Sequence, residues 1–156
     1  MRFKFTVLAL VLAAPPLLAA EPLPSFDEVR RRYRETNDMG RVSYLYRRCA
    51  ALQLNVAALL VRRKQFEIAK NYEDLSSNYM ILSERVDIQL DRMQGNKSTK
   101  TMETVSLAVK HLSTAYSQRM NDNQRKHGAY FSGDRVLEAE LAECVDVDQF
   151  VKNLKN

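Results

Sequence analysis

The two cysteines are the first residues in this sequence whose type and spacing could do chemistry. Cys49 and Cys144 are the only cysteines among the 156 residues. An even cysteine count in an exported chain is typical of a disulfide, because compartments outside the cytosol favour oxidation. Both positions lie on apolar helical faces, so two buried reduced thiols are the alternative. We expect the disulfide, which would close a loop of about 95 residues and contribute roughly 4–5 kcal/mol in the chain-entropy model.

The histidines and carboxylates form no recognisable metal or catalytic motif. His111 and His127 have no carboxylate at ligand spacing, and no HExxH, CxxCH or GxSxG pattern occurs. Glu138, Glu140 and Glu143 could supply a general acid and base, but their helical spacing is more typical of a solvated acidic face. The sequence therefore predicts no catalytic residue, no metal and no cofactor, and we expect the protein not to be an enzyme.

Aromatic and apolar side chains near the C-terminus are the candidates for contact with a partner. Tyr130 and Phe131 lie in a loop, where they could face a partner or, as we expect, fold over the open end of the helices. Phe150 and Leu154 belong to an apolar stripe over residues 147–154. A helix this short is marginal alone in water. We expect it to pack back on the bundle and bury Phe150; a free tail that meets a membrane or a partner is the alternative.

Positive charge is concentrated in the first half of the chain. Basic clusters occur at residues 30–34, 47–48 and 62–64, whereas acidic residues dominate 134–148. This polarity could direct the protein toward an anionic envelope surface. Consecutive arginines point around a helix, however, so we expect solvated faces that also attract each other within the bundle. The overall surplus is too mild for a nucleic-acid binder, and we expect no nucleic acid as a partner.

Residues 1–20 have the three-part layout of a secretory signal peptide. A basic start precedes an apolar run, and small residues follow before the charged Glu21. Pro15 and Pro16 interrupt the run before the roughly 20 apolar residues that a membrane anchor needs. We expect cleavage after Ala20, a periplasmic or secreted location, and no transmembrane anchor in the mature chain. Cleavage removes Arg2 and Lys4 and lowers the net charge from +5 to +3.

Apolar residues recur at helical spacing from residue 25 to the end, and no strand pattern occurs. Ser25 with Glu28 forms a capping box at the first start, and Ser98 or Thr99 is expected to cap a later one. No glycine or proline lies near residues 62–66, so a break there is expected only from the basic cluster, with one long bent helix as the alternative. The expected helices cover residues 25–37, 42–62 and 66–93. A fourth is expected from the cap at Ser98 or Thr99 to residue 127, and a fifth from Asp134, with helical spacing continuing to the end of the chain.

Apolar stripes of this kind must be buried against each other. The sequence therefore predicts that residues 21–156 form a single all-α domain. Its architecture is a four-helix-type bundle with a short additional N-terminal helix, fastened by one disulfide.

By elimination, these patterns indicate an exported, non-enzymatic helical module with a structural role or an unidentified protein partner. One alternative is a small-ligand carrier with an apolar cavity between the helices, lined by some of its tyrosines. Another is an enzyme without a recognisable motif. Asn96 begins a glycosylation pattern that matters only in a eukaryotic source. The tyrosines that could line such a cavity, or form the edges of the core, are Tyr33, Tyr44, Tyr46, Tyr72, Tyr79 and Tyr116.

Overall fold

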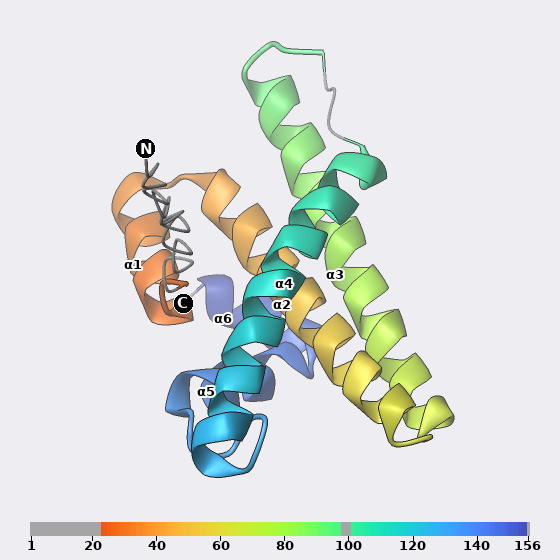
Figure 1. Ribbon diagram of the computed structural model, residues 1–156. Coiled ribbons are helices and arrows are strands. Elements are labelled where there is room, and N and C mark those ends of the chain that lie inside the picture. Colours follow the sequence, from red (N-terminus) through yellow and green to blue (C-terminus); the bar gives the residue numbers. More distant parts are fainter. Residues whose placement is uncertain (1–22, 98–100, 156) are drawn as a thin grey trace, which may run out of the picture.

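All regular structure in the described part of the chain is helical (Figure 1). The computed structural model describes residues 23–97 and 101–155. The predicted signal peptide and the expected caps Ser98 and Thr99 lie outside these residues. The predicted fold class is confirmed, because the helices pack as an all-α bundle that a disulfide fastens.

Helix α1 (Phe26–Thr36) begins as the capping pattern predicts. The Ser25 side chain accepts a hydrogen bond from the backbone N–H of Glu28, at 3.2 Å. The helix ends at Asn37, which adopts a left-handed conformation. Two residues of its inner face, Phe26 and Val29, are buried, so α1 is docked on the bundle through a narrow apolar stripe.

Helix α2 (Met39–Arg62) is the centre of the molecule. It contacts α1, α3, α4 and α5 directly, and it reaches α6 through the ring of Tyr46, which packs on Phe150. A helix surrounded in this way buries residues on more than one face. Helix α3 (Phe66–Met93) runs back along α2 after a short turn, so the predicted break between the two helices is confirmed.

Helix α4 (Met102–His127) crosses α2 (Figure 1). It packs more extensively against α2 than against α3. Thr101 is its N-cap, and the backbone N–H of Thr101 donates to the Thr104 side chain at 3.0 Å. The cap is therefore later than the Ser98 or Thr99 expected from the sequence, because Thr104 closes the capping box from inside the helix.

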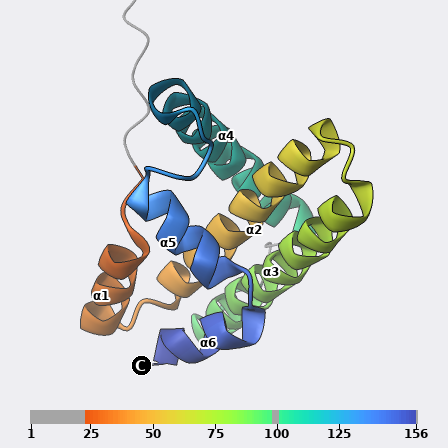
Figure 2. The same ribbon diagram turned by 90° about the horizontal axis from the view of Figure 1, so that it is seen from below.

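Two short helices close the bundle from below (Figure 2). Helix α5 (Arg135–Cys144) lies against α2, and helix α6 (Val147–Lys155) lies against α3 and α5. The Asp134 side chain caps α5 by accepting from the N–H groups of Val136 and Leu137. The helical conformation is interrupted between α5 and α6. There the Asp146 side chain accepts a hydrogen bond from the backbone N–H of Gln149 at 3.0 Å.

The space between α1, α2, α3 and α6 is filled by aromatic rings. The Phe150 ring packs edge-on against Tyr79 at 5.6 Å between centroids and against Phe26 at 5.9 Å, and it lies 6.0 Å from Tyr46. Such edge-to-face pairs contribute beyond the area that they bury. The prediction that residues 147–154 pack back on the bundle and bury Phe150 is confirmed, and Leu154 is buried with it.

Candidate functional site

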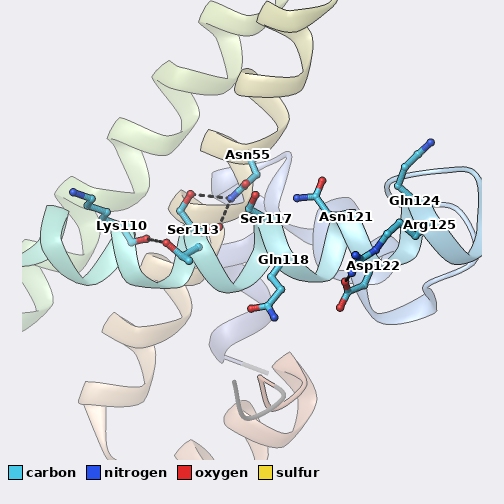
Figure 3. A pocket seen from close by; sticks show the side chains of 10 residues that line it. Asn55, Lys110, Ser113, Ser117, Gln118, Asn121, Asp122, Gln124 and Arg125 are labelled. Carbon is cyan, nitrogen blue, oxygen red and sulfur yellow. Dashed lines mark hydrogen bonds and ion pairs between the residues drawn. The ribbon is translucent and has the colours of Figure 1, made fainter. Parts of the chain in front are cut away.

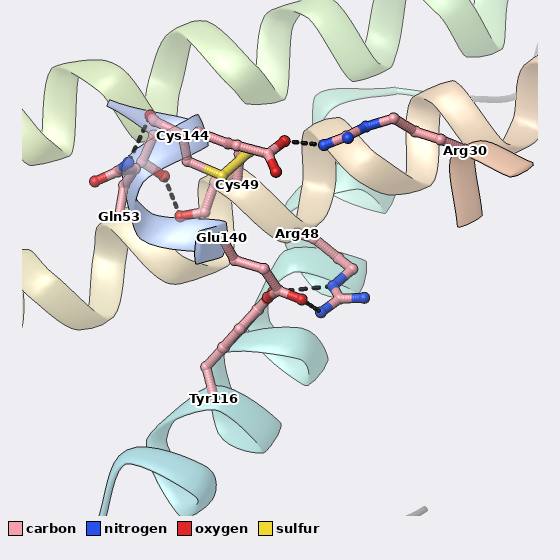
Figure 4. The surroundings of a disulfide bond; sticks show 10 residues. Arg30, Arg48, Cys49, Gln53, Tyr116, Glu140 and Cys144 are labelled. Carbon is pink, nitrogen blue, oxygen red and sulfur yellow. Dashed lines mark hydrogen bonds and ion pairs between the residues drawn. A yellow bond between two sulfur atoms is a disulfide. The ribbon is translucent and has the colours of Figure 1, made fainter. Parts of the chain in front are cut away.

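A buried network of Arg48, Tyr116 and Glu140 joins three helices beside the disulfide (Figure 4). The Arg48 side chain is 0% exposed and that of Glu140 is 3% exposed. Arg48 Nη2 donates to Glu140 Oε1 at 2.6 Å, and Arg48 Nε donates to the Tyr116 hydroxyl at 2.9 Å. The Tyr116 hydroxyl donates to Glu140 Oε2 at 2.5 Å. Arg48 Nη1 also donates to the backbone carbonyl of Pro24. The guanidinium and the carboxylate are thus satisfied by the protein itself.

Aromatic rings surround the Arg48 guanidinium. Its central carbon lies 4.8 Å from the centroid of the Phe26 ring, 5.5 Å from that of Tyr116 and 5.8 Å from that of Tyr44. A cation is attracted to ring faces, and more strongly where water is excluded. Both Pro24 and Phe26 contact Arg48, so this one side chain fixes the start of α1 as well as α5 on α2.

Burial governs the protonation of the network. It raises the pKa of Glu140 above the ordinary value of 4.5, although the Arg48 charge and the Tyr116 hydrogen bond oppose the rise. Burial also raises the pKa of Tyr116 well above 10.0. The Tyr116 phenol therefore stays protonated, and its O–H donates a hydrogen bond to Glu140. A catalytic group must touch a substrate, and these groups are enclosed, so their arrangement serves to position helices.

This network does not follow from any motif in the sequence. The prediction that Glu140 belongs to a solvated acidic face is wrong, because Glu140 is buried. A signal was present in the spacing. Glu140 lies three residues after Leu137 and four residues before Cys144, so the three share one stripe of the helix. Its two neighbours on this stripe are apolar and buried. A carboxylate on such a stripe requires a cationic partner.

The predicted disulfide between Cys49 and Cys144 is confirmed. The two Cα atoms are 5.3 Å apart, within the reach of a disulfide. Around it, Gln53 Nε2 donates to the Cys144 carbonyl at 2.6 Å, and Arg30 forms an ion pair with Glu143 (Figure 4). The end of α5 is therefore held to α2 by a covalent bond and to both α1 and α2 by polar contacts.

The other residues singled out from the sequence do not meet at one place. Tyr130 and Phe131 are half-buried and pack against the core from the α4–α5 loop. Asn123 holds this loop by donating to two of its carbonyl groups. Phe150 and Leu154 are inside the bundle. The α4–α5 loop and the C-terminal helix therefore both pack on the bundle, as expected from the sequence.

The histidines lie apart on the surface of α4. His111 and His127 are both exposed, and they are separated by about 24 Å along the helix axis. Among residues 23–97 and 101–155, no group of three or more His, Cys, Asp or Glu side chains is placed to hold a metal ion. No helix in the same ranges is both long and apolar enough to span a bilayer.

A polar groove of about 790 Å³ follows the outer side of α4 (Figure 3). Asn55 reaches it from α2 and donates to the Ser113 hydroxyl at 2.9 Å and to the Ser113 carbonyl at 3.0 Å. Its other polar residues include Ser117, Gln118 and Asn121 on α4. The groove offers hydrogen bonds over an open surface without a concentrated charge.

A second groove, of about 650 Å³, lies between α3 and the corner that joins α5 to α6. Ile81 on α3 and Val145 at the corner are large apolar residues exposed at this groove. Arg85 lines it on α3, and Asp146 and Asp148 line it on the corner. This combination of exposed apolar side chains and charges of both signs is typical of a protein contact surface. We call it the α3–corner groove.

Comparison of the chain with models of protein families, with curated proteins and with solved structures gives no match.

Proposed function

We propose that the protein is an exported, non-enzymatic helical module that binds a partner protein in the α3–corner groove. The observation that carries this proposal is the exposure of Ile81 and Val145 at the same groove. Exposed apolar side chains that are gathered in a depression, and bordered by charges, favour an interaction site over a chance surface.

The shape and charge of the groove favour an amphipathic helix as the bound element. One long helix and a compact corner form its two sides, an arrangement that suits a helix laid in a groove. Apolar side chains of the partner would contact Ile81 and Val145. Its basic side chains would lie opposite Asp146 and Asp148, and an acidic one opposite Arg85.

The disulfide supports a binding role because it preorganises one side of the groove. Val145 follows Cys144 directly, so the bridge to α2 restrains the corner that presents Val145. A surface that is rigid before binding loses less conformational freedom when a partner arrives. Export is supported by the layout of residues 1–20 and by the disulfide, since such bonds persist in oxidising compartments.

Site-specific photocrosslinking in the native compartment tests the binding proposal. A photoreactive residue in place of Ile81 should yield one defined crosslinked protein, and a second substitution, Val145→Asp, should abolish the product. Leu107, which is 57% exposed on α4, provides the matched control position and should not yield the product. The same product from both positions would refute the proposal, as would a product that contains only a second copy of this chain.

The N-terminus of the mature protein tests export separately. Mass spectrometry of the native product should find a chain that begins at or near Glu21. Retention of Met1 in a membrane fraction would contradict the signal-peptide assignment.

A further inference from the structure

The turn between α2 and α3 exposes apolar and basic side chains together at one end of the molecule. We call residues 61–66 the α2–α3 tip. Figure 1 shows this turn at the lower right, at the opposite end of α2 from α1. Phe66 is 61% exposed and Val61 is 42% exposed. Arg62, Arg63 and Lys64 lie between them and are exposed as well.

Most of the other arginine clusters form ion pairs with acidic side chains, whereas, among the described residues, the cations of the tip do not. Arg47 forms an ion pair with Asp87, and Arg48 forms one with Glu140. In the part of the chain that the structure describes, no ion pair or side-chain hydrogen bond involves residues 62–64. Glu67, in the first turn of α3, is the nearest acidic residue along the chain. Three exposed cations therefore lie together at the tip, with one acidic residue in the adjoining first turn of α3.

Lys64 occupies a backbone position that favours glycine. Its φ of 60° is left-handed, and it directly follows the helix C-cap, Arg63. The Gln65 N–H donates to the Leu60 carbonyl at 2.9 Å across it, the closing bond of a Schellman turn. A lysine in this conformation is less favourable than a glycine. The turn thus has a positively charged lysine at a position where the backbone conformation favours an uncharged glycine.

We propose that the α2–α3 tip docks on an anionic lipid bilayer. The cations would contact lipid phosphates, and the Phe66 ring with Val61 would enter the interfacial layer. A protein partner is less well suited to this end of the molecule, because a stable protein interface needs about 800 Å² on each side. Docking on a planar anionic surface requires only a few cations and an apolar anchor at a protruding point of the protein. This site is separate from the α3–corner groove.

The absence of tryptophan from the sequence allows a direct test of insertion. Phe66→Trp introduces a single tryptophan at the tip. Its fluorescence should shift to the blue with vesicles of phosphatidylglycerol mixed with phosphatidylcholine, and not with phosphatidylcholine alone. Leu107→Trp is the matched control, because Leu107 is 57% exposed on α4, away from the tip. Equal shifts at the two positions, or no shift at the tip, would overturn the proposal.

Charge variants test the electrostatic part by vesicle sedimentation. Arg62→Gln with Arg63→Gln should lower partitioning onto the anionic vesicles about 25-fold, since each basic residue near such a surface contributes about fivefold. The control, Arg125→Gln with Lys126→Gln, removes the same charge from the end of α4, where Arg125 contacts Asp122. It should change partitioning less than twofold. A loss as large in the control would mean that only net charge matters, and would refute docking by the tip.

Lys64→Gly separates a binding role from a structural one. Glycine suits the left-handed turn, so the variant should unfold at a higher denaturant concentration than the original chain. Its partitioning onto anionic vesicles should nevertheless fall about fivefold. Unchanged partitioning in this correctly folded variant would contradict the proposal.

Discussion

Removing either partner of the buried ion pair between Arg48 and Glu140 should destabilise the fold far more than removing both. Glu140→Leu leaves the guanidinium enclosed, with its remaining hydrogen bonds to the Tyr116 hydroxyl and the Pro24 carbonyl. Arg48→Met leaves the carboxylate enclosed with only the Tyr116 hydroxyl as a donor. The double substitution replaces both charges by apolar side chains of comparable length.

The burial of the pair sets the magnitude. Both side chains are almost wholly inaccessible to solvent, so each single substitution should cost about 3–5 kcal/mol. Domains of this kind have about 5–15 kcal/mol of stability in total, so either variant should lose a substantial fraction of it. The double variant avoids an uncompensated buried charge. It should recover at least about 2 kcal/mol relative to the less stable single variant, although contacts of Arg48 with aromatic rings such as Phe26 are lost.

Guanidinium unfolding of the oxidised protein, followed by far-ultraviolet circular dichroism, provides the measurement. Arg30 and Glu143 offer a control pair that joins α1 to α5 but is partly exposed, and the substitutions Arg30→Met and Glu143→Leu should cost about 1 kcal/mol or less each. The reasoning would be refuted if the Arg48 and Glu140 single variants lost no more than the controls. Additive losses in the double variant would refute it as well.

Three further predictions concern other parts of the fold. Reduction of the bridge between Cys49 and Cys144 should lower the melting temperature and leave the far-ultraviolet helical signal largely intact, because apolar helix seams still hold the bundle; complete loss of helicity would contradict this. Tyr79→Phe should raise the free energy of unfolding by about 1 kcal/mol in chemical denaturation, because the buried Tyr79 hydroxyl has no hydrogen-bond partner among the described residues; a loss of stability would reveal one. Burial alone would raise the pKa of Asp134, but hydrogen bonds from Arg119 and from two backbone N–H groups hold it below the ordinary value of 3.8. Stability from this carboxylate is present above pH 3.8 and lost as the pH falls through the lower folded value, so Asp134→Asn should flatten the acid limb of a plot of stability against pH, and an unchanged limb would disprove the assignment.

The helices and the disulfide could be predicted because their signals are local or compositional. The apolar stripe of α2 and the cap at Ser25 follow directly from spacing and residue type. The pairing of Cys49 with Cys144 followed from the even cysteine count together with the signal-peptide layout of residues 1–20. The docking of Phe150 followed from the marginal stability of a short isolated helix.

The buried network and the grooves could not be predicted in the same way. Arg48 and Glu140 are 92 residues apart in sequence, and nothing local identifies one as the partner of the other. Their contact depends on how α5 is rotated against α2, which is a property of tertiary packing. The α3–corner groove depends likewise on the break near Val145, where the sequence indicates continued helical spacing but the Asp146 side chain starts a new helix.

The position of the two cysteines also determines how the protein must be made. Cys49 leaves the ribosome long before Cys144, because α3 and α4 are synthesised between them. During that interval the Cys49 thiol can form a disulfide only with another molecule, and such mixed disulfides delay maturation. Helix α2 packs most extensively against α3, which follows it directly, so a helical hairpin can form around Cys49 before α5 exists. Once Cys144 emerges, a single intramolecular pairing is available, so the oxidised chain has no alternative intramolecular disulfide to rearrange.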